Sequence, residues 1–135
     1  MSQLTAVRKG EGVTSMATIL VIDDDRFLRA FLRTALERDH HDVIEASNGR
    51  LGLELYRAQS TDVVITDLVM PELDGLHLIY ELTRSFVNVK VIAMTGGADS
   101  DSGLTTAKLL GARQTLEKPF ALDTLLGAVQ DELAD

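Results

Sequence analysis

The chain has 135 residues, of which 45% are hydrophobic, with no cysteine and a formal net charge of -8 at pH 7. This length and apolar content predict one folded domain with a single core, and the missing cysteines exclude disulfides and thiolate metal sites. The acidic charge disfavours direct nucleic-acid binding, and no apolar run reaches the roughly 20 residues of a membrane span, so we expect a cytoplasmic protein.

The first 16 residues differ from the rest of the chain. They are polar and have no periodic apolar face. We interpret residues 1–16 as a flexible N-terminal extension or an added leader, since Met16 can itself serve as a start residue. The regular pattern begins at Ala17, so residues 17–135 form the predicted domain.

From there on, short apolar runs rich in β-branched residues alternate with amphipathic segments. The short runs are typical of buried parallel strands, and the amphipathic segments are typical of helices. The expected strands are 18–22, 42–46, 62–66, 89–94 and 113–117, and the expected helices are 26–38, one around 51–56, one capped by Asp74, 102–110 and 122–133. These five β-α repeats predict an α/β fold in which helices cover both faces of a five-stranded parallel sheet.

Two groups of side chains invite a structural interpretation. Phe27 and Phe31 are spaced i, i+4 on the first helix, a spacing typical of core packing. His40, His41 and His77 have no recognisable partner, so we expect them on the solvated surface.

Four of the strands lead into a polar residue. Asp23 and Asp24 follow the first strand, Asp67 the third, Thr95 the fourth and Lys118 the fifth. Ligands of such sheets bind outside the carboxyl ends of the strands, where the strand order reverses. If the first and third strands are neighbours, the polar residues meet at one site.

The three aspartates predict a metal site. Two carboxylates about 4 Å apart repel by about 4 kcal/mol at an effective dielectric near 20, and a divalent cation would relieve that repulsion. Oxygen ligands without cysteine or clustered histidine favour Mg²⁺, or Mn²⁺, over zinc or copper. We assign Asp23, Asp24 and Asp67 to this site, whereas Asp25 is better explained as a helix cap or a turn residue.

The remaining polar residues suit phosphoryl transfer. A carboxylate at a strand end, here Asp67, can act as a nucleophile and form an aspartyl phosphate. Lys118 supplies a positive charge and Thr95 a hydroxyl, while Gly96 leaves its backbone N–H open to a phosphoryl oxygen. Each residue alone is common in loops, but their order at the strand ends is specific.

The segment from about 18 to 133 resembles the response-regulator receiver domains of two-component signalling. This resemblance implies a doubly wound, flavodoxin-like single domain whose strands, numbered along the chain, lie in the order 2-1-3-4-5. The matching motifs are Leu20-Val21-Ile22-Asp23-Asp24, Asp67 with Met70-Pro71 and Asp74-Gly75, Met94-Thr95-Gly96, and Glu117-Lys118-Pro119-Phe120.

The resemblance also implies a reaction. Asp67 would accept a phosphoryl group from a phosphohistidine, carried by a histidine kinase or a histidine phosphotransfer protein. Asp24 and Asp67 would bind Mg²⁺ directly, Asp23 would act through water, and Val69 would contribute its backbone carbonyl. Such a protein catalyses only its own phosphotransfer and slow autodephosphorylation, so we do not expect an enzyme.

Further implications concern the phosphoryl group and the partners. Thr95, Lys118 and the backbone of Gly96 would contact the phosphoryl group, and the peptide bond between Lys118 and Pro119 would be cis. Phosphorylation would switch binding to an unknown output partner. The family docks or dimerises through its fourth and fifth helices, which implies a monomer or a weak dimer.

This chain departs from the family pattern at two positions. Thr115 stands where receivers commonly have an aromatic residue, three positions before the lysine. We therefore expect the signal to pass through the loop and helix after Thr95 without an aromatic flip. Val69 stands where many receivers have a polar side chain, and because it cannot orient a hydrolytic water, we expect slow dephosphorylation.

The strongest rival hypothesis is an enzyme. Asp23 and Asp25 after a first strand also resemble the haloacid-dehalogenase-type phosphatases, in which Asp23 would be the nucleophile and Asp25 the general acid. The turn at Arg26 and Phe27, the missing late acidic pair and the missing cap insertion disfavour this hypothesis. It also leaves Asp67 unexplained.

Two more hypotheses are weaker still. A phosphorylation-independent binding module would require the loss of a site residue, and none is lost. An EF-hand loop is excluded because Phe27 follows Asp25 and no glycine stands at the turn position. The sequence stops at Asp135, soon after the last expected helix, so we expect either a stand-alone receiver or a domain of a longer protein.

Overall fold

The computed structural model describes residues 17–97 and 100–134 of the chain. The predicted N-terminal extension, residues 1–16, lies outside the described residues. The strands are β2 (Thr18–Ile22), β3 (Asp42–Ala46), β4 (Val63–Asp67), β5 (Val91–Thr95) and β6 (Gln114–Glu117), and the helices are α1 (Arg26–Arg38), α2 (Gly49–Ala58), α3 (Gly75–Ser85), α4 (Ser100–Leu110) and α5 (Leu122–Ala134). The predicted alternation of strands and helices is confirmed.

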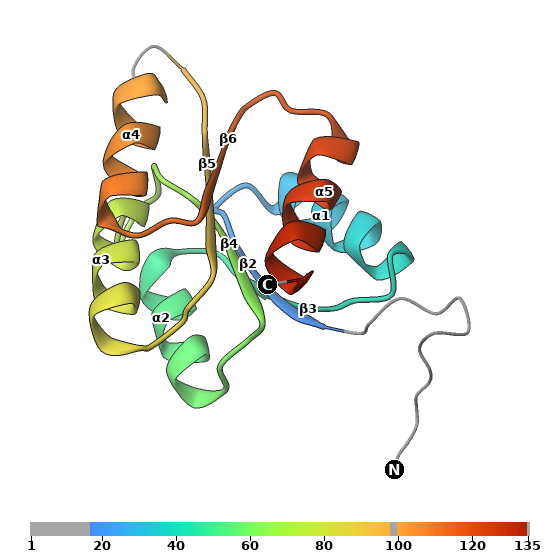
Figure 1. Ribbon diagram of the computed structural model, residues 1–135, viewed down its shortest axis with the longest axis horizontal. Coiled ribbons are helices and arrows are strands. Elements are labelled where there is room, and N and C mark those ends of the chain that lie inside the picture. Colours follow the sequence, from blue (N-terminus) through green and yellow to red (C-terminus); the bar gives the residue numbers. More distant parts are fainter. Residues whose placement is uncertain (1–16, 98–99, 135) are drawn as a thin grey trace.

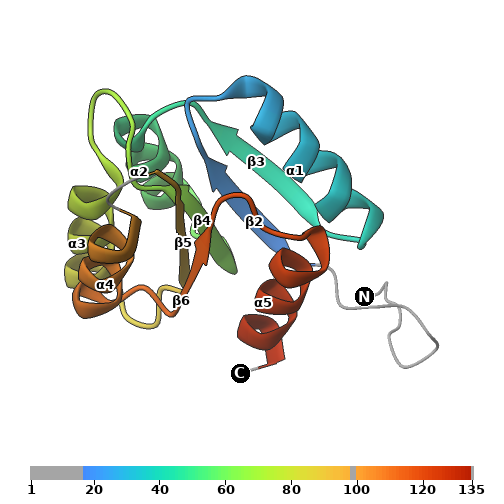
Figure 2. The same cartoon turned by 90° about the horizontal axis from the view of Figure 1, so that it is seen from above.

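The five strands form one parallel sheet in the order β3-β2-β4-β5-β6. Numbered along the chain, this is the expected order 2-1-3-4-5. The order reverses between β2 and β4, which makes their carboxyl ends the switch point of the sheet. Helices α1 and α5 cover one face, and α2, α3 and α4 cover the other (Figures 1 and 2).

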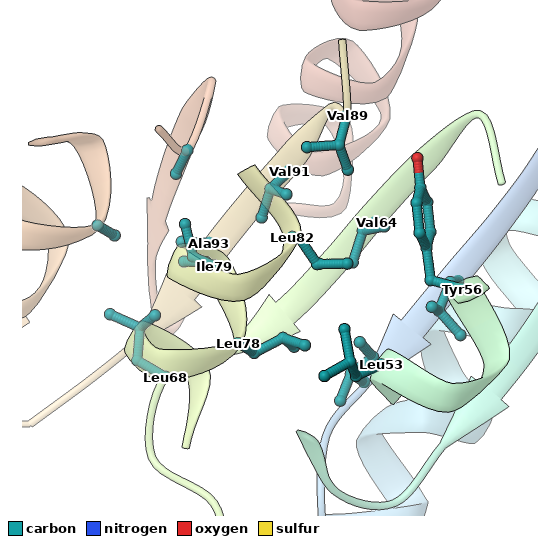
Figure 3. Close-up of a cluster of buried hydrophobic side chains, with 14 of the residues drawn as sticks. Leu53, Tyr56, Val64, Leu68, Leu78, Ile79, Leu82, Val89, Val91 and Ala93 are labelled. Carbon is teal, nitrogen blue, oxygen red and sulfur yellow. The ribbon is translucent and has the colours of Figure 1, made fainter. Parts of the chain in front are cut away.

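Each face of the sheet contributes to its own core, because successive side chains of a strand point to opposite faces. One core lies between the sheet and helices α2, α3 and α4, and Figure 3 shows Leu78, Ile79 and Leu82 of α3 among its members. The other core lies against α1 and α5. The central strands therefore have apolar residues at almost every position, as fully buried parallel strands do.

Three helices begin at side-chain caps. Asp25 accepts hydrogen bonds from the backbone N–H groups of Phe27 and Leu28, so the expectation that Asp25 caps a helix is confirmed. Asn48 caps α2, and Asp74 caps α3 as predicted. Each cap satisfies N–H groups that have no partner within the first helical turn.

Strands β4, β5 and β6 begin one or two residues later than expected, and two strands also extend further at their carboxyl ends. β4 ends at Asp67 and β5 ends at Thr95, each one residue later than predicted. The apolar run marks only part of each strand. The backbone pairing continues past the last apolar residue, since Asp67 pairs in register with Met94. Two site residues therefore belong to rigid strands rather than to loops.

The expectation that Phe27 and Phe31 pack in the core is wrong. Their exposed fractions are 74% and 54%. Helix α1 instead turns Leu32 and Leu36 toward the sheet, and both are fully buried. The i, i+4 spacing occurs on both faces of α1, and only packing against the sheet selects one of them.

The expectation for the histidines is confirmed for His40 and His77, which are exposed, and wrong for His41. His41 is buried at the start of β3, and burial lowers the pKa of its imidazole. The chain reverses just before it, where His40 has a φ of 70°, and this tight turn points His41 inward.

No helix in the described ranges has both the length and the apolar character that a membrane crossing requires.

Candidate functional site

The three predicted metal ligands lie together at the carboxyl ends of β2 and β4. These strands pair in register up to Ile22 and Thr66, so the residues that follow them are neighbours. Asp23, Asp24 and Asp67 each place a carboxylate oxygen within 4.8 Å of the others. The arrangement follows directly from β2 and β4 being adjacent.

Asp67 is a buried carboxylate of this group with a fixed orientation. It is 7% exposed, and its Oδ1 accepts a hydrogen bond of 2.9 Å from the backbone N–H of Leu68. Burial and the neighbouring Asp23 raise the pKa of Asp67, against the opposing effects of Lys118 and backbone hydrogen bonds. The ionised form of Asp67 is therefore electrostatically disfavoured, and a cation beside it would stabilise that form.

Lys118 bridges two of the aspartates. Its Nζ lies 3.2 Å from Asp23 Oδ2 and 3.5 Å from Asp67 Oδ1. The backbone N–H of Lys118 donates to the carbonyl of Thr95 at 2.7 Å, which links the ends of β5 and β6. The expected cis peptide bond between Lys118 and Pro119 is present.

Thr95 and Gly96 lie on the neighbouring strand end. Thr95 is buried at the end of β5, and Gly96 is exposed just beyond it. A Cβ at Gly96 would lie only 3.1 Å from Cβ of Lys118, so glycine lets the two strand ends approach. The predicted phosphoryl contacts therefore come from adjacent strands beside Asp67.

Val69 and Thr115 also have defined places. Val69 is 74% exposed in the loop after β4, two residues beyond Asp67. Thr115 is half-buried in β6 and pairs in register with Ala93 of β5. Neither side chain is aromatic or charged, so both departures from the expected pattern, two residues after Asp67 and three before Lys118, are present in the described part of the fold.

Gly75 is a site residue whose role sequence reasoning missed. Its N–H donates to the Leu68 carbonyl at 2.9 Å, which joins the start of α3 to the end of β4. A Cβ at Gly75 would lie 2.2 Å from the carbonyl oxygen of Asp67, closer than any real contact. The motif Asp74-Gly75 was noted in the sequence, but a steric role depends on which backbone approaches it.

Arg29 is a second residue that sequence reasoning missed. From α1 its guanidinium donates to the backbone carbonyl of Asp23 at 2.6 Å and to Glu45 at 2.9 Å. A sequence signal existed, because Glu45 is a charged residue between the apolar residues Ile44 and Ala46 of a strand. Its meaning appears only once α1 lies over β3.

The donor set fits a hard divalent cation. The three residues offer only carboxylate oxygens, two of them on buried residues, and Lys118 stands at one side of the cluster. Carboxylate and carbonyl oxygens are the ligands that Mg²⁺ and Mn²⁺ prefer. Asp23, Asp24 and Asp67 are therefore the residues that would hold such an ion, and the family resemblance adds the carbonyl of Val69 as an expected ligand.

A known family model matches most of the chain. The family model described as the response regulator receiver domain matches residues 19–130. Response regulator MprA of Mycolicibacterium vanbaalenii is 37% identical over 112 residues, which are 83% of this chain and 48% of that protein. The chain thus spans about half the length of that relative.

Other relatives are matched over nearly their whole length. Chemotaxis protein CheY of Bacillus subtilis is 32% identical over 116 residues, which are 85% of this chain and 96% of that protein. Among solved structures, a response regulator receiver domain from Clostridium thermocellum has a TM-score of 0.81 and 34% identity, covering 87% of this chain and 94% of that one.

Proposed function

The chain belongs to the response regulator receiver domain family of two-component signalling, and on that premise we propose that it accepts a phosphoryl group on Asp67. The family acts with histidine kinases and output domains. The proposed donor is a phosphohistidine on a histidine kinase or a phosphotransfer protein. The observation that best supports this proposal is the contact of Lys118 with both Asp23 and Asp67.

The proposed step is a substitution at phosphorus. A carboxylate oxygen of Asp67 attacks the phosphorus atom, and the bond from phosphorus to the histidine nitrogen breaks. The electron pair of that bond returns to the imidazole, which takes up a proton from solvent. The product is an acyl phosphate at the end of β4, on a strand residue that is held in place by the Leu68 N–H.

The residues around Asp67 have separate proposed roles. Bound Mg²⁺ would neutralise phosphoryl oxygens and reduce the repulsion among the aspartates. Lys118, already within 3.5 Å of Asp67 Oδ1, would move its ion pair onto a phosphoryl oxygen. The hydroxyl of Thr95 and the N–H of Gly96 would donate to the remaining oxygens. The protein turns over its own phosphate and no external substrate.

The rival phosphatase hypothesis has less support. It requires Asp25 as a free general acid, whereas Oδ1 of Asp25 accepts two hydrogen bonds as the cap of α1. It also requires Asp23 as the nucleophile. Asp23 is 0% exposed and is paired with Lys118, and it therefore offers an incoming substrate less access than Asp67 does.

The first prediction tests the proposal on the wild-type chain. Incubation with acetyl phosphate and Mg²⁺ is expected to add one phosphoryl group per chain, measured as intact mass, because the small acyl phosphate replaces the histidine donor. EDTA is expected to prevent the gain. Hydrolysis of p-nitrophenyl phosphate without any stable gain in mass would instead support the phosphatase.

The second prediction concerns the lifetime of the phosphoryl group. Val69 has no hydrogen-bonding side chain, so it cannot hold the attacking water beside Asp67. Val69→Asn is expected to speed loss of the phosphoryl group by roughly tenfold, the rate effect of one hydrogen bond of about 1.4 kcal/mol made in the transition state.

The measurement is the decay of phosphorylated mass after acetyl phosphate is removed. Val87→Asn is the matched control, because Val87 is 89% exposed in the loop before β5. It is expected to decay at the wild-type rate. A wild-type chain that already loses phosphate as fast as Val69→Asn would contradict the prediction.

We further propose that the phosphorylation state is read through α4. With Thr115 in β6, an aromatic side chain is not available at that position for the readout. Ser100 at the start of α4 donates a 2.5 Å hydrogen bond to Glu117, the residue before Lys118. This contact supports a direct connection between the site and the α4 surface.

A further inference from the structure

Arg29 links three elements that meet beside the metal ligands. Its side chain is 16% exposed on α1. One guanidinium nitrogen donates to the backbone carbonyl of Asp23 at the end of β2, and another donates to Glu45 on β3. The planar guanidinium presents its donors in a rigid geometry, so both contacts hold it in one orientation.

Glu45 is itself held from two sides. Its Oε2 accepts a 3.2 Å hydrogen bond from Arg33, one helical turn beyond Arg29, while its Oε1 accepts from Arg29. Arg33 also donates to the backbone carbonyl of Val43. A half-buried carboxylate is costly unless its oxygens are paired. This pairing makes Glu45 a fixed anchor for Arg29.

Asp23 has hydrogen bonds on its amide, its carbonyl and its side chain. Its N–H donates to the Ala46 carbonyl at 3.1 Å, and its Oδ1 accepts from the N–H of Asp25 at 2.9 Å. The carbonyl contact with Arg29 fixes the plane of the peptide bond between Asp23 and Asp24. Because Asp24 is exposed, the direction of its carboxylate depends on the backbone that bears it.

We propose that Arg29 is a positioning residue for the cation site: by holding the Asp23 carbonyl it directs the carboxylates of Asp23 and Asp24 toward Asp67. This inference rests on the proposed function, because it assumes that the aspartates bind Mg²⁺. Residues that orient metal ligands without touching the metal commonly determine its affinity.

Charge and position predict opposite effects for Arg29. As a fixed positive charge near the site, the guanidinium repels a divalent cation, so its removal would tighten Mg²⁺ binding if charge alone mattered. As a positioning group, its removal lets the peptide plane between Asp23 and Asp24 turn, which weakens binding. The sign of the change therefore separates the two roles.

The third prediction is a Mg²⁺ titration of the full chain by isothermal titration calorimetry. Arg29→Met keeps the apolar stem and is expected to raise the Kd for Mg²⁺ by about tenfold or more. Arg29→Lys keeps the charge but cannot span both acceptors, so it is expected to raise the Kd by a smaller factor. Arg33→Met is the comparison variant: Arg33 holds the anchor Glu45 but does not contact Asp23, so the variant is expected to raise the Kd by a clearly smaller factor than Arg29→Met does.

A second readout needs no metal. The N–H of Asp25, which donates to Asp23 Oδ1, is expected to exchange with solvent faster in Arg29→Met than in Arg33→Met, measured by amide NMR. If Arg29→Met does not fold, as judged by circular dichroism, Arg29→Lys takes its place in both measurements.

The outcomes separate this inference from the proposed function. An unchanged or lower Kd in Arg29→Met, or an unchanged Kd in Arg29→Lys, overturns the role of Arg29 alone, as long as the wild type binds Mg²⁺ and takes up phosphate. A wild type that does not bind Mg²⁺ overturns the proposed function, and the inference with it.

Discussion

Asp67→Asn is expected to abolish the gain of a phosphoryl group from acetyl phosphate completely, while the protein becomes more stable in the absence of divalent cations. The amide lacks the nucleophilic oxygen, so no acyl phosphate can form. The gain in stability comes from the electrostatics of the free site, where a buried Asp67 lies beside Asp23 without a metal. Loss of function and gain of stability thus have the same origin.

The pH dependence of this effect follows from the raised pKa of Asp67, caused first by burial and then by Asp23. The folded state holds the proton more tightly than the unfolded state. The stability that the protonated Asp67 carboxyl contributes to the wild type is therefore complete below the unfolded pKa, near the ordinary value of 3.8. This contribution is lost as the pH rises through the folded pKa. Asp67→Asn is expected to exceed the wild type in Tm at neutral pH, and the difference is expected to shrink as the pH falls.

The measurement is thermal unfolding at several pH values, with EDTA and with Mg²⁺. Added Mg²⁺ is expected to stabilise the wild type more than the variant, because the variant lacks one carboxylate ligand. Asp131→Asn, at an exposed position of α5, controls for the change in net charge. Phosphoryl uptake by Asp67→Asn would contradict the assignment of Asp67. The assignment would also be contradicted if Asp23→Asn lost phosphoryl uptake and the turnover of a phosphomonoester proved to need Asp23.

Gly75→Ala is expected to lower the free energy of unfolding by at least about 2 kcal/mol, near the upper part of the range for overpacked sites. The added Cβ would lie 2.2 Å from the Asp67 carbonyl oxygen and 2.5 Å from Cα of Leu68. Both contacts are backbone atoms of a buried strand end, which cannot move aside as a flexible side chain can. The start of α3 must therefore shift away from β4.

The same substitution is expected to slow phosphorylation, because Asp67 is the residue that the new methyl group pushes. Chemical denaturation gives the stability, and the rate of mass gain with acetyl phosphate gives the second effect. Gly127→Ala is the matched control in α5, since a Cβ at Gly127 meets no atom within 4 Å. It is expected to stabilise the protein by about 0.5 to 1 kcal/mol, as alanine does in a helix interior. Equal stability of the two variants would contradict the close approach of Gly75 in α3 to the backbone of Asp67.

Local chemistry explains why much of the fold could be predicted. The apolar run of β2 is visible in the sequence because both faces of this central strand are buried, and the run gave β2 its correct bounds. The bounds of β3, an edge strand, were also predicted correctly. Asp25 and Asp74 were predicted as caps because capping depends on residues only two or three positions away. The strand order was expected from the family resemblance and not from these local signals.

The residues of the candidate site likewise include some that local sequence indicates and some that it does not. Asp23, Asp67 and Lys118 were found from their positions after apolar runs, and the adjacency of β2 and β4 brings them together. Their separate roles stay predictions until the phosphorylation and Mg²⁺ experiments are done. Arg29 and Gly75 were missed because each acts on backbone atoms at the end of a neighbouring strand, a contact that depends on how the helix packs and that no sequence pattern indicates.

The sequence by itself determined which segments form strands and helices and which aspartates cap α1 and α3, since these properties depend on near neighbours. Tertiary structure alone decided which helix face is covered, and so left Phe27 and Phe31 exposed while burying His41. It also decided that α3 approaches Asp67 closely enough to require Gly75. The physical reason is that periodicity fixes the side chains that share a face, whereas contact between faces depends on how distant elements pack.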